Sequence, residues 1–186
     1  TNLVILCAEG TYYPKAVKGR FLRISNKDLK IIGGYPRLST NNSKSNPDIF
    51  KVILDGDIDK NDSLMPDSTY IMNGNNASTV LYLGGHGDCW FEGLTFQHGD
   101  NSSGNGGGLY VKGKTSILKC HFNRNRAMNG GAICSAGWDT LIIDSCVFQN
   151  NNSTDTTKRS DEHIDELDGG GAIYAKAKLI VSWSKF

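Results

Sequence analysis

A repeat of about 26 residues constrains the fold of this chain more than any other feature of its sequence. Three similar segments end in Phe96, Phe122 and Phe148, so the closing phenylalanines are equally spaced along the chain. A fourth segment ends in Phe186 after a longer interval, and the additional residues fall in the polar stretch 152–167. Repeats of this length are typical of solenoids, in which each unit packs only against its neighbours.

Within each repeat, the apolar residues follow the period of a β-strand. They lie seven, five, two and zero residues before the closing phenylalanine. Steps of two are the alternation of a strand, and the step of three indicates a bend between two short strands. A third strand is expected after the glycines of three related segments, Gly106-Gly-Gly-Leu109, Gly130-Gly-Ala-Ile133 and Gly170-Gly-Ala-Ile173. Three strands in a repeat too short for a βαβ unit predict an all-β fold, a parallel β-helix.

Composition agrees with many short strands and excludes two classes of function. The chain has 22 glycines and 17 asparagines, which are residues that accept tight turns and positive φ. A net charge of +1 gives no electrostatic basis for nucleic-acid binding or for a polybasic membrane surface. No apolar run approaches the roughly 20 residues of a transmembrane helix, so no transmembrane segment is expected.

The whole of residues 1–186 is expected to form one β-helix domain, of about 26 residues per coil and roughly six to seven coils. Polar stretches near 39–48, 59–76 and 152–167 are expected to loop out from the helix surface. The last repeat stops at Phe186 in the middle of its pattern, so we expect the chain to be part of a longer protein.

Stacked coils place equivalent residues above one another at a spacing of about 4.8 Å. The expected aromatic column is Phe96, Phe122, Phe148 and Phe186, and the expected aliphatic column is Phe91, Ile117, Ile143 and Val181. Asn125 and Asn151 each lie three residues past a phenylalanine, where their amides are expected to form a short ladder.

Cysteine usage indicates neither a zinc site nor a full disulfide framework. The five cysteines are odd in number and include no CxxC pair. Cys120 and Cys146 share a column with Leu94 and Ser184, at a spacing that permits a disulfide. We favour free thiols that act as small apolar core residues.

Two motifs carry a resemblance to a known family. Gly-Gly-Ala-Ile at 130–133 and 170–173, with Phe-x-x-Asn at 122–125 and 148–151, resembles the repeat of the polymorphic outer membrane proteins. These are bacterial surface adhesins built as right-handed β-helices. The segments 8–14, 29–35 and 52–57 are similar to the start of secreted β-helix proteins of the pectate-lyase-like superfamily. The resemblance implies a right-handed β-helix and leaves the function open, because this fold carries both enzymes and adhesins.

Polysaccharide lyases of this superfamily need a lysine or arginine base beside calcium-holding carboxylates. The candidate bases are Lys119 and Arg124, with His121 beside them, among the cations Lys112, Lys114 and Arg126. Glu92 and Asp144 share one repeat position but lie two coils apart, about 10 Å, which is too far for one metal. An ordinary solvated polar face is the favoured interpretation of these residues.

Asp55, Asp57 and Asp59 are the candidate metal ligands, and calcium is the only cofactor they suggest. The EF-hand pattern fails because Lys60 and Pro66 stand at its sixth and twelfth positions, so a turn with an acidic rim is favoured.

The insertion 153–168 carries six acids and His163. Two interpretations are open for it, a variable binding loop and a weak metal site. Tyr12, Tyr13, Tyr35, Tyr82 and Trp138 are candidate sugar platforms, although aromatic residues are more often core. His86 and His98 receive no catalytic role.

The first hypothesis for function is a non-catalytic, adhesin-like module of a bacterial cell surface or outer membrane, or a secreted one. Its partner would be a glycan or a host surface protein bound through loops. The alternatives are a polysaccharide lyase or other carbohydrate-active enzyme, and a structural spacer. The open last coil also predicts either further coils or end-to-end self-association, because an uncovered strand edge invites pairing.

Overall fold

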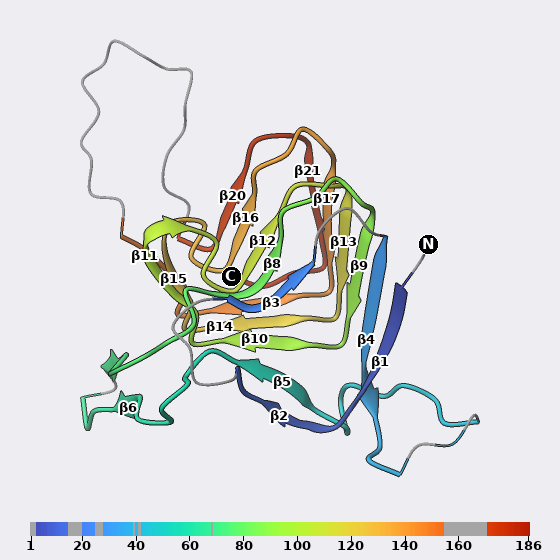
Figure 1. The fold of residues 1–186 in the computed structure, drawn as a ribbon, viewed down its shortest axis with the longest axis horizontal. Coiled ribbons are helices and arrows are strands. Elements are labelled where there is room, and N and C mark those ends of the chain that lie inside the picture. Colours follow the sequence, from blue (N-terminus) through green and yellow to red (C-terminus); the bar gives the residue numbers. More distant parts are fainter. Residues whose placement is uncertain are drawn as a thin grey trace.

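The chain forms stacked, mostly parallel β-sheets around one apolar core (Figure 1). This computed structural model describes residues 3–14, 20–24, 28–38, 40, 42–67, 69–154 and 171–186. Among these residues there is no helix, and hence none that is long and apolar enough to cross a membrane. The all-β arrangement of parallel strands is that of a β-helix, as the repeat predicts; the number of coils stays a prediction.

Three large parallel sheets form the walls, and each is named here by the order in which the chain enters it. The first sheet is β1 (Leu3–Ala8), β4 (Leu29–Tyr35), β9 (Cys89–Glu92), β13 (Thr115–Leu118), β17 (Leu141–Asp144) and β21 (Leu179–Ser182). The second sheet is β2 (Gly10–Tyr12), β5 (Val52–Asp55), β10 (Thr95–Gln97), β14 (His121–Asn123) and β18 (Val147–Gln149). The third sheet is β3 (Arg20–Ile24), β8 (Thr79–Leu83), β12 (Leu109–Val111), β16 (Ile133–Ser135) and β20 (Ile173–Ala175).

Two smaller sheets go beyond the three strands that the sequence pattern indicates. A short parallel sheet lies between the second and third, formed by β11 (Asp100–Asn105), β15 (Arg126–Asn129) and β19 (Asn152–Ser153). An ion pair between Arg126 and Asp100 joins two of its strands. The other is an antiparallel hairpin of β6 (Ser63–Leu64) and β7 (Tyr70–Ile71), within the polar stretch 59–76. It projects from the body of the molecule (Figure 1).

Single residues in the left-handed conformation turn the chain at the corners. Between the first and second sheets these are Gly93, Lys119, Ser145 and Trp183, with φ of 65°, 48°, 53° and 49°. Between the second and short sheets they are His98, Arg124 and Asn150, with φ of 58°, 53° and 55°. Each set occupies one repeat position, so the irregular step in the apolar pattern corresponds to a one-residue corner.

The closing phenylalanines form one continuous stack inside the second sheet. The ring centroids of Phe96 and Phe122 are 4.9 Å apart, those of Phe122 and Phe148 are 5.0 Å apart, and those of Phe148 and Phe186 are 4.8 Å apart. The aliphatic column lies in the first sheet, where register pairs Phe91 with Ile117, Ile117 with Ile143, and Ile143 with Val181. Both columns point into the core, because alternate residues of each strand point inward, and only their last members, Val181 and Phe186, are exposed.

Asn125 and Asn151 form a hydrogen-bonded ladder at the corner between the second sheet and the short sheet. Nδ2 of Asn125 donates to Oδ1 of Asn151 over 3.0 Å and to the carbonyl oxygen of Phe96 over 3.0 Å. Oδ1 of Asn125 accepts the backbone N–H of Gly99 at 3.1 Å. The buried Asn125 amide therefore satisfies the polar backbone of the coil on one side and the side chain of the coil on the other.

All five cysteines are free thiols, and Cys120 and Cys146 are buried neighbours. Burial raises the pKa of Cys146 to about 11 and raises that of Cys120 further. The two thiols donate to backbone carbonyl oxygens of β13 and β17 instead of to each other. Cys120 donates to Leu118, and Cys146 donates to Ile117 and Asp144.

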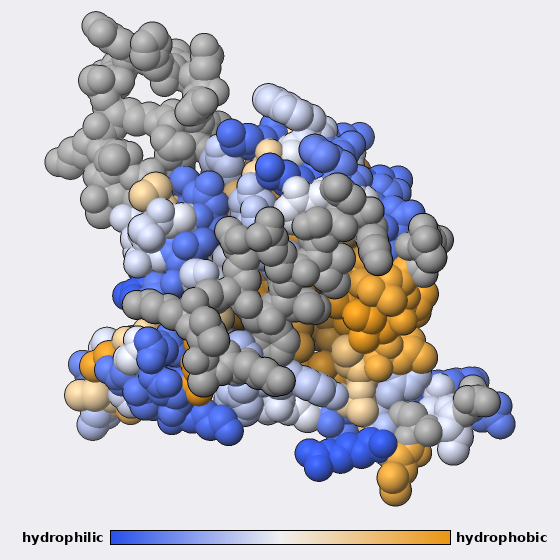
Figure 2. Space-filling model, in the orientation of Figure 1, coloured by the Kyte–Doolittle hydropathy of each residue, from blue (hydrophilic) through white to orange (hydrophobic). Residues whose placement is uncertain are grey.

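The two outermost strands of the first sheet leave apolar side chains exposed. These are Leu3, Val4 and Leu6 on β1, and Leu179, Ile180 and Val181 on β21. Figure 2 shows hydrophobic residues gathered on the side of the molecule where β1 and β4 lie. End-to-end self-association stays a prediction.

Candidate ligand-binding surface

The outer face of the first sheet carries a tryptophan in a row of polar and apolar side chains. Alternation along β9 buries Cys89 and Phe91 and turns Trp90 outward. Register places Lys30 of β4 beside Trp90 and Ser116 of β13 on its other side, with Val4 of β1 beyond Lys30. Four neighbouring strands thus contribute one side chain each to the row.

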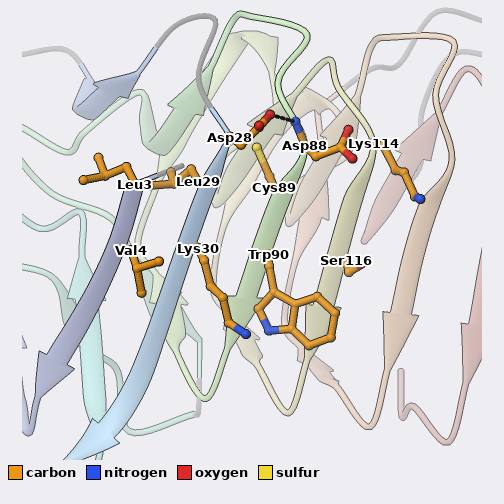
Figure 3. Close-up of a pocket in the computed structure, with 10 residues that line it drawn as sticks. All are labelled: Leu3, Val4, Asp28, Leu29, Lys30, Asp88, Cys89, Trp90, Lys114 and Ser116. Carbon is orange, nitrogen blue, oxygen red and sulfur yellow. Dashed lines mark hydrogen bonds between the residues drawn. The ribbon is translucent and has the colours of Figure 1, made fainter. Parts of the chain in front are cut away.

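This row lies in a hollow of about 320 Å³ (Figure 3), named here the Trp90 hollow. Its floor is Trp90 with Lys30 and Ser116, and Asp28, Asp88 and Lys114 stand at one end, where the strands begin. Oδ1 of Asp28 accepts the backbone N–H of Asp88 at 3.0 Å, which joins the turns before β4 and β9. A hollow with an aromatic ring on its floor and charged groups at one end is suited to a ligand with both apolar and hydroxyl-bearing surfaces.

Two contacts fix the Trp90 ring. The Lys30 ammonium nitrogen lies 4.8 Å from the ring centroid, and the indole N–H donates to Oε2 of Glu92 over 3.2 Å. The ring is thus held from both β4 and β9. Stacking of a ligand on it therefore costs the Trp90 side chain little conformational entropy.

The aromatic residues that the sequence suggests as sugar platforms lie elsewhere, and Trp90 is not among them. The Tyr12 hydroxyl donates to the carbonyl oxygen of Ala8, Tyr13 lies beneath the Lys60 ammonium group, and Tyr82 stacks on Tyr110. Trp138 is exposed. The available signal for Trp90 was its outward position between two inward residues of the repeat.

A second hollow, of about 190 Å³, brings together two of the three candidate bases. Lys119 and His121 line it with Lys51, Asp48 and Ser145. Partial burial lowers the pKa of His121, and the positive charge of Lys51 lowers it further, against the opposing effect of Asp48. Its neighbours therefore favour the neutral imidazole.

Arg124, the third candidate base, lies at a different corner of the coil. Its guanidinium carbon is 4.5 Å from the Tyr70 ring centroid, and Tyr70 stacks on His98 with centroids 5.0 Å apart. Tyr70 belongs to the projecting hairpin, so this stack fastens the hairpin to the body of the molecule. Arg124 and Lys119 are not brought together.

The carboxylates of Asp55, Asp57 and Asp59 are engaged by donors of the protein. Asp55 accepts from Nδ1 of His98 at 2.8 Å, from Gln97 at 2.8 Å and from the backbone of Asp57 at 3.0 Å. Asp57 and Asp59 accept backbone N–H groups of the hairpin loop, from residues 61, 62 and 75. In the part of the chain that the structure describes, no three His, Cys, Asp or Glu residues form a group that could hold a metal ion.

The acidic residues of the third insertion and His163 lie outside the described residues, which resume at 171. Glu92 and Asp144 both face outward from the first sheet and pair in register with Leu118 between them. Asp144 accepts the Ser182 hydroxyl at 3.0 Å, and Glu92 accepts the indole N–H of Trp90.

Part of the chain matches a known protein family. Residues 145–176, from the corner before β18 to the end of β20, match the repeat of the Chlamydia polymorphic membrane proteins. No curated protein and no solved structure matches the chain. The matched segment contains Phe148-x-x-Asn151 and Gly170-Gly-Ala-Ile173, so this stretch of the chain is similar to that repeat.

Proposed function

We propose that this chain is a non-catalytic, adhesin-like β-helix module of a bacterial cell surface, and that it binds a glycan in the Trp90 hollow. The match to the polymorphic membrane protein repeat supports the cell-surface location, at the outer membrane, and the right-handed β-helix. The Trp90 hollow is the observation that carries the binding function. The proposed site is the outer face of a sheet, whereas the sequence predicts binding through loops.

The chemistry of the hollow favours a sugar over a purely apolar ligand. A pyranose presents C–H groups on one face, which pack on an aromatic ring, and hydroxyl groups at its rim, which pair with carboxylates and ammonium groups. Trp90 offers the ring, with Ser116 beside it, and Asp28, Asp88 and Lys114 offer polar groups at one end of the hollow, which Leu3, Val4 and Leu29 also line. A host surface protein is the alternative partner of the same face.

The test is a glycan array probed with the labelled chain, followed by calorimetric titration of each glycan that is retained. Trp90→Ala is expected to weaken binding at least tenfold, because it removes the stacking surface. Trp183→Ala is the matched control, because Trp183 is 90% exposed and lies outside the hollow, and it should leave the affinity unchanged. Retention of no glycan, or equal affinity of the Trp90→Ala variant and the unaltered chain, would overturn the proposal.

The pairing of Lys119 with His121 in one hollow favours a second candidate function, cleavage of an acidic polysaccharide. A neutral imidazole or amine can act as a base on a uronate. Incubation with polyuronates, followed by the ultraviolet absorbance of unsaturated products, distinguishes the two functions. The adhesin-like function predicts no rise in absorbance, and a rise that Lys119→Ala abolishes would establish the enzyme.

A further inference from the structure

At the start of the second-sheet strands, a glycine lies between two lysines of the neighbouring coils. Register pairs Leu54 of β5 with Phe96 of β10, and Phe96 with Phe122 of β14. Three residues before each of these, the chain has Lys51, Gly93 and Lys119 in turn, of which Gly93 and Lys119 are corner residues. Two lysines, one coil above and one coil below, thus flank a position with no side chain.

The gap left by Gly93 is part of the second hollow, named here the Lys51–Lys119 notch. It is lined by Lys51, Lys119 and His121 and by one carboxylate, that of Asp48, with Pro47 against Gly93. A side chain at Gly93 would displace Pro47, which lines the notch, since a Cβ there would lie 2.7 Å from Cβ of Pro47. Glycine therefore keeps the notch open, besides accepting the positive φ of the corner.

The cations of the notch are not used by the fold. Within the described residues, the side chains of Lys51, Lys119 and His121 have no hydrogen-bond or ion-pair partner. The stability of the coil does not account for two lysines and a histidine around one hollow, because like charges repel one another. Partial burial lowers the pKa of His121, the positive charge of Lys51 lowers it further, and Asp48 offsets these effects only in part.

We propose that the Lys51–Lys119 notch binds the negatively charged group of an acidic glycan, a carboxylate or a sulfate ester. Two ammonium groups on either side of the anion neutralise its charge, and His121 gains a proton as the anion enters, because a nearby negative charge favours the imidazolium. The proposal rests on the proposed function for the glycan, and it assigns a second contact on a different sheet from Trp90.

The test follows the pKa of His121 by NMR, from the titration of its imidazole C–H signals at constant ionic strength. Addition of glucuronate or of a sulfated monosaccharide is expected to raise the pKa of His121, and a neutral methyl glucoside should leave it unchanged. A response to one anion alone assigns the carboxylate or the sulfate, and a response to both assigns the charge. His86 is the internal control, because it is exposed and lies outside the notch.

Two variants decide whether the notch causes the response. The double variant Lys51→Gln, Lys119→Gln is expected to bind the anion roughly tenfold more weakly and to lose most of the change at His121. Lys178→Gln is the matched control, since Lys178 is exposed and away from the notch, and it should respond like the unaltered chain. No change at His121, an equal change in the double variant, or an equal change at His86 would overturn the inference.

Failure of this inference is distinguishable from failure of the proposed function. Trp90→Ala should weaken glycan binding without altering the response of His121 to a monosaccharide anion. If Trp90→Ala weakens binding while the double lysine variant binds acidic and neutral glycans like the unaltered chain, the notch proposal is wrong and the proposed function stands.

Discussion

The rings of Phe122 and Phe148 stack with centroids 5.0 Å apart and planes within 4° of parallel. Phe96 covers the other face of Phe122 at 4.9 Å, so that Phe122 is in contact on both faces and fully buried. Phe186 ends the same stack and is 70% exposed. Phenylalanines at the same repeat position thus differ in burial. The ring inside the column is buried, and the ring at its end is exposed.

Phe122→Ala is expected to lower the free energy of unfolding by about 3–5 kcal/mol, because it leaves a cavity between two aromatic rings. Phe186→Ala should cost less than about 1.5 kcal/mol, since that ring is largely exposed. Urea denaturation followed by circular dichroism measures both values. Equal costs at the two positions would contradict a core built on this column.

Asn125→Ala is expected to cost about 2–4 kcal/mol, because it removes the partner of the Phe96 carbonyl and of the Gly99 N–H, and one of the donors to Oδ1 of Asn151. Asn123→Ala is the control, since that side chain faces outward two residues earlier, and its cost should stay within about 0.5 kcal/mol. A similar loss of stability for both variants in the same denaturation experiment would argue against the ladder.

Asn150 tests the energetic role of the left-handed corners. It is exposed and has a φ of 55°, so a substitution there changes backbone strain with little change in packing. Asn150→Val should destabilise the chain by about 1–2 kcal/mol, because a β-branched side chain is strained at positive φ. Asn150→Gly should change stability by less than about 0.5 kcal/mol, and the midpoint of thermal unfolding orders the variants. A valine variant as stable as the glycine variant would contradict the corner geometry.

The core columns could be predicted from the sequence because a stacked repeat converts its period directly into spatial register. Phe96, Phe122 and Phe148 follow one another at equal spacing, and no long-range information is needed to align them. The one-residue corners were visible as an irregular step in the same pattern. The short sheet of β11, β15 and β19 was not predicted, because its polar residues carry no apolar alternation.

The two hollows could not be predicted, because both depend on pairing outside the regular repeat. Lys30 lies beside Trp90 although the two are far apart in the chain. Lys51 and Gly93 are likewise separated by the hairpin of β6 and β7. Neither separation is a multiple of the repeat, so spacing alone does not align these residues. The register of β4 and β5 had to come from the structure.

The thiols should react at rates set by burial and thiolate content. Burial raises the pKa of Cys89 to about 11 and that of Cys134 to about 12, and the Cys120 and Cys146 thiols are buried in the same way. Burial raises the pKa of Cys7 as well, but Cys7 is only half-buried, so at pH 8 the folded chain should react slowly with a disulfide reagent, and Cys7 should react first. Denaturant should release all five thiols, and Cys7→Ser should remove the fast phase. Rapid reaction of several thiols in the folded chain would contradict the buried column.

Asp55 should make part of the stability depend on pH. Burial opposes its ionisation, but hydrogen bonds from His98, from the Asp57 backbone and from Gln97 outweigh burial and hold its pKa below the usual 3.8. A lowered pKa in the folded state contributes stability that is present above pH 3.8 and lost as the pH falls through the folded value.

We expect Asp55→Asn to cost about 1–3 kcal/mol at neutral pH, because the variant lacks the charge-assisted hydrogen bonds of the carboxylate. The cost should fall progressively as the pH falls below 3.8, because the unaltered chain then loses the same bonds when Asp55 is protonated. Asp139→Asn, at an exposed carboxylate, should change stability by less than about 0.5 kcal/mol. Urea midpoints measured from neutral pH down to pH 3 test the difference. A cost at Asp55 that stays constant over that range would show that the His98 contact contributes through shape and packing and not through the charge of the carboxylate.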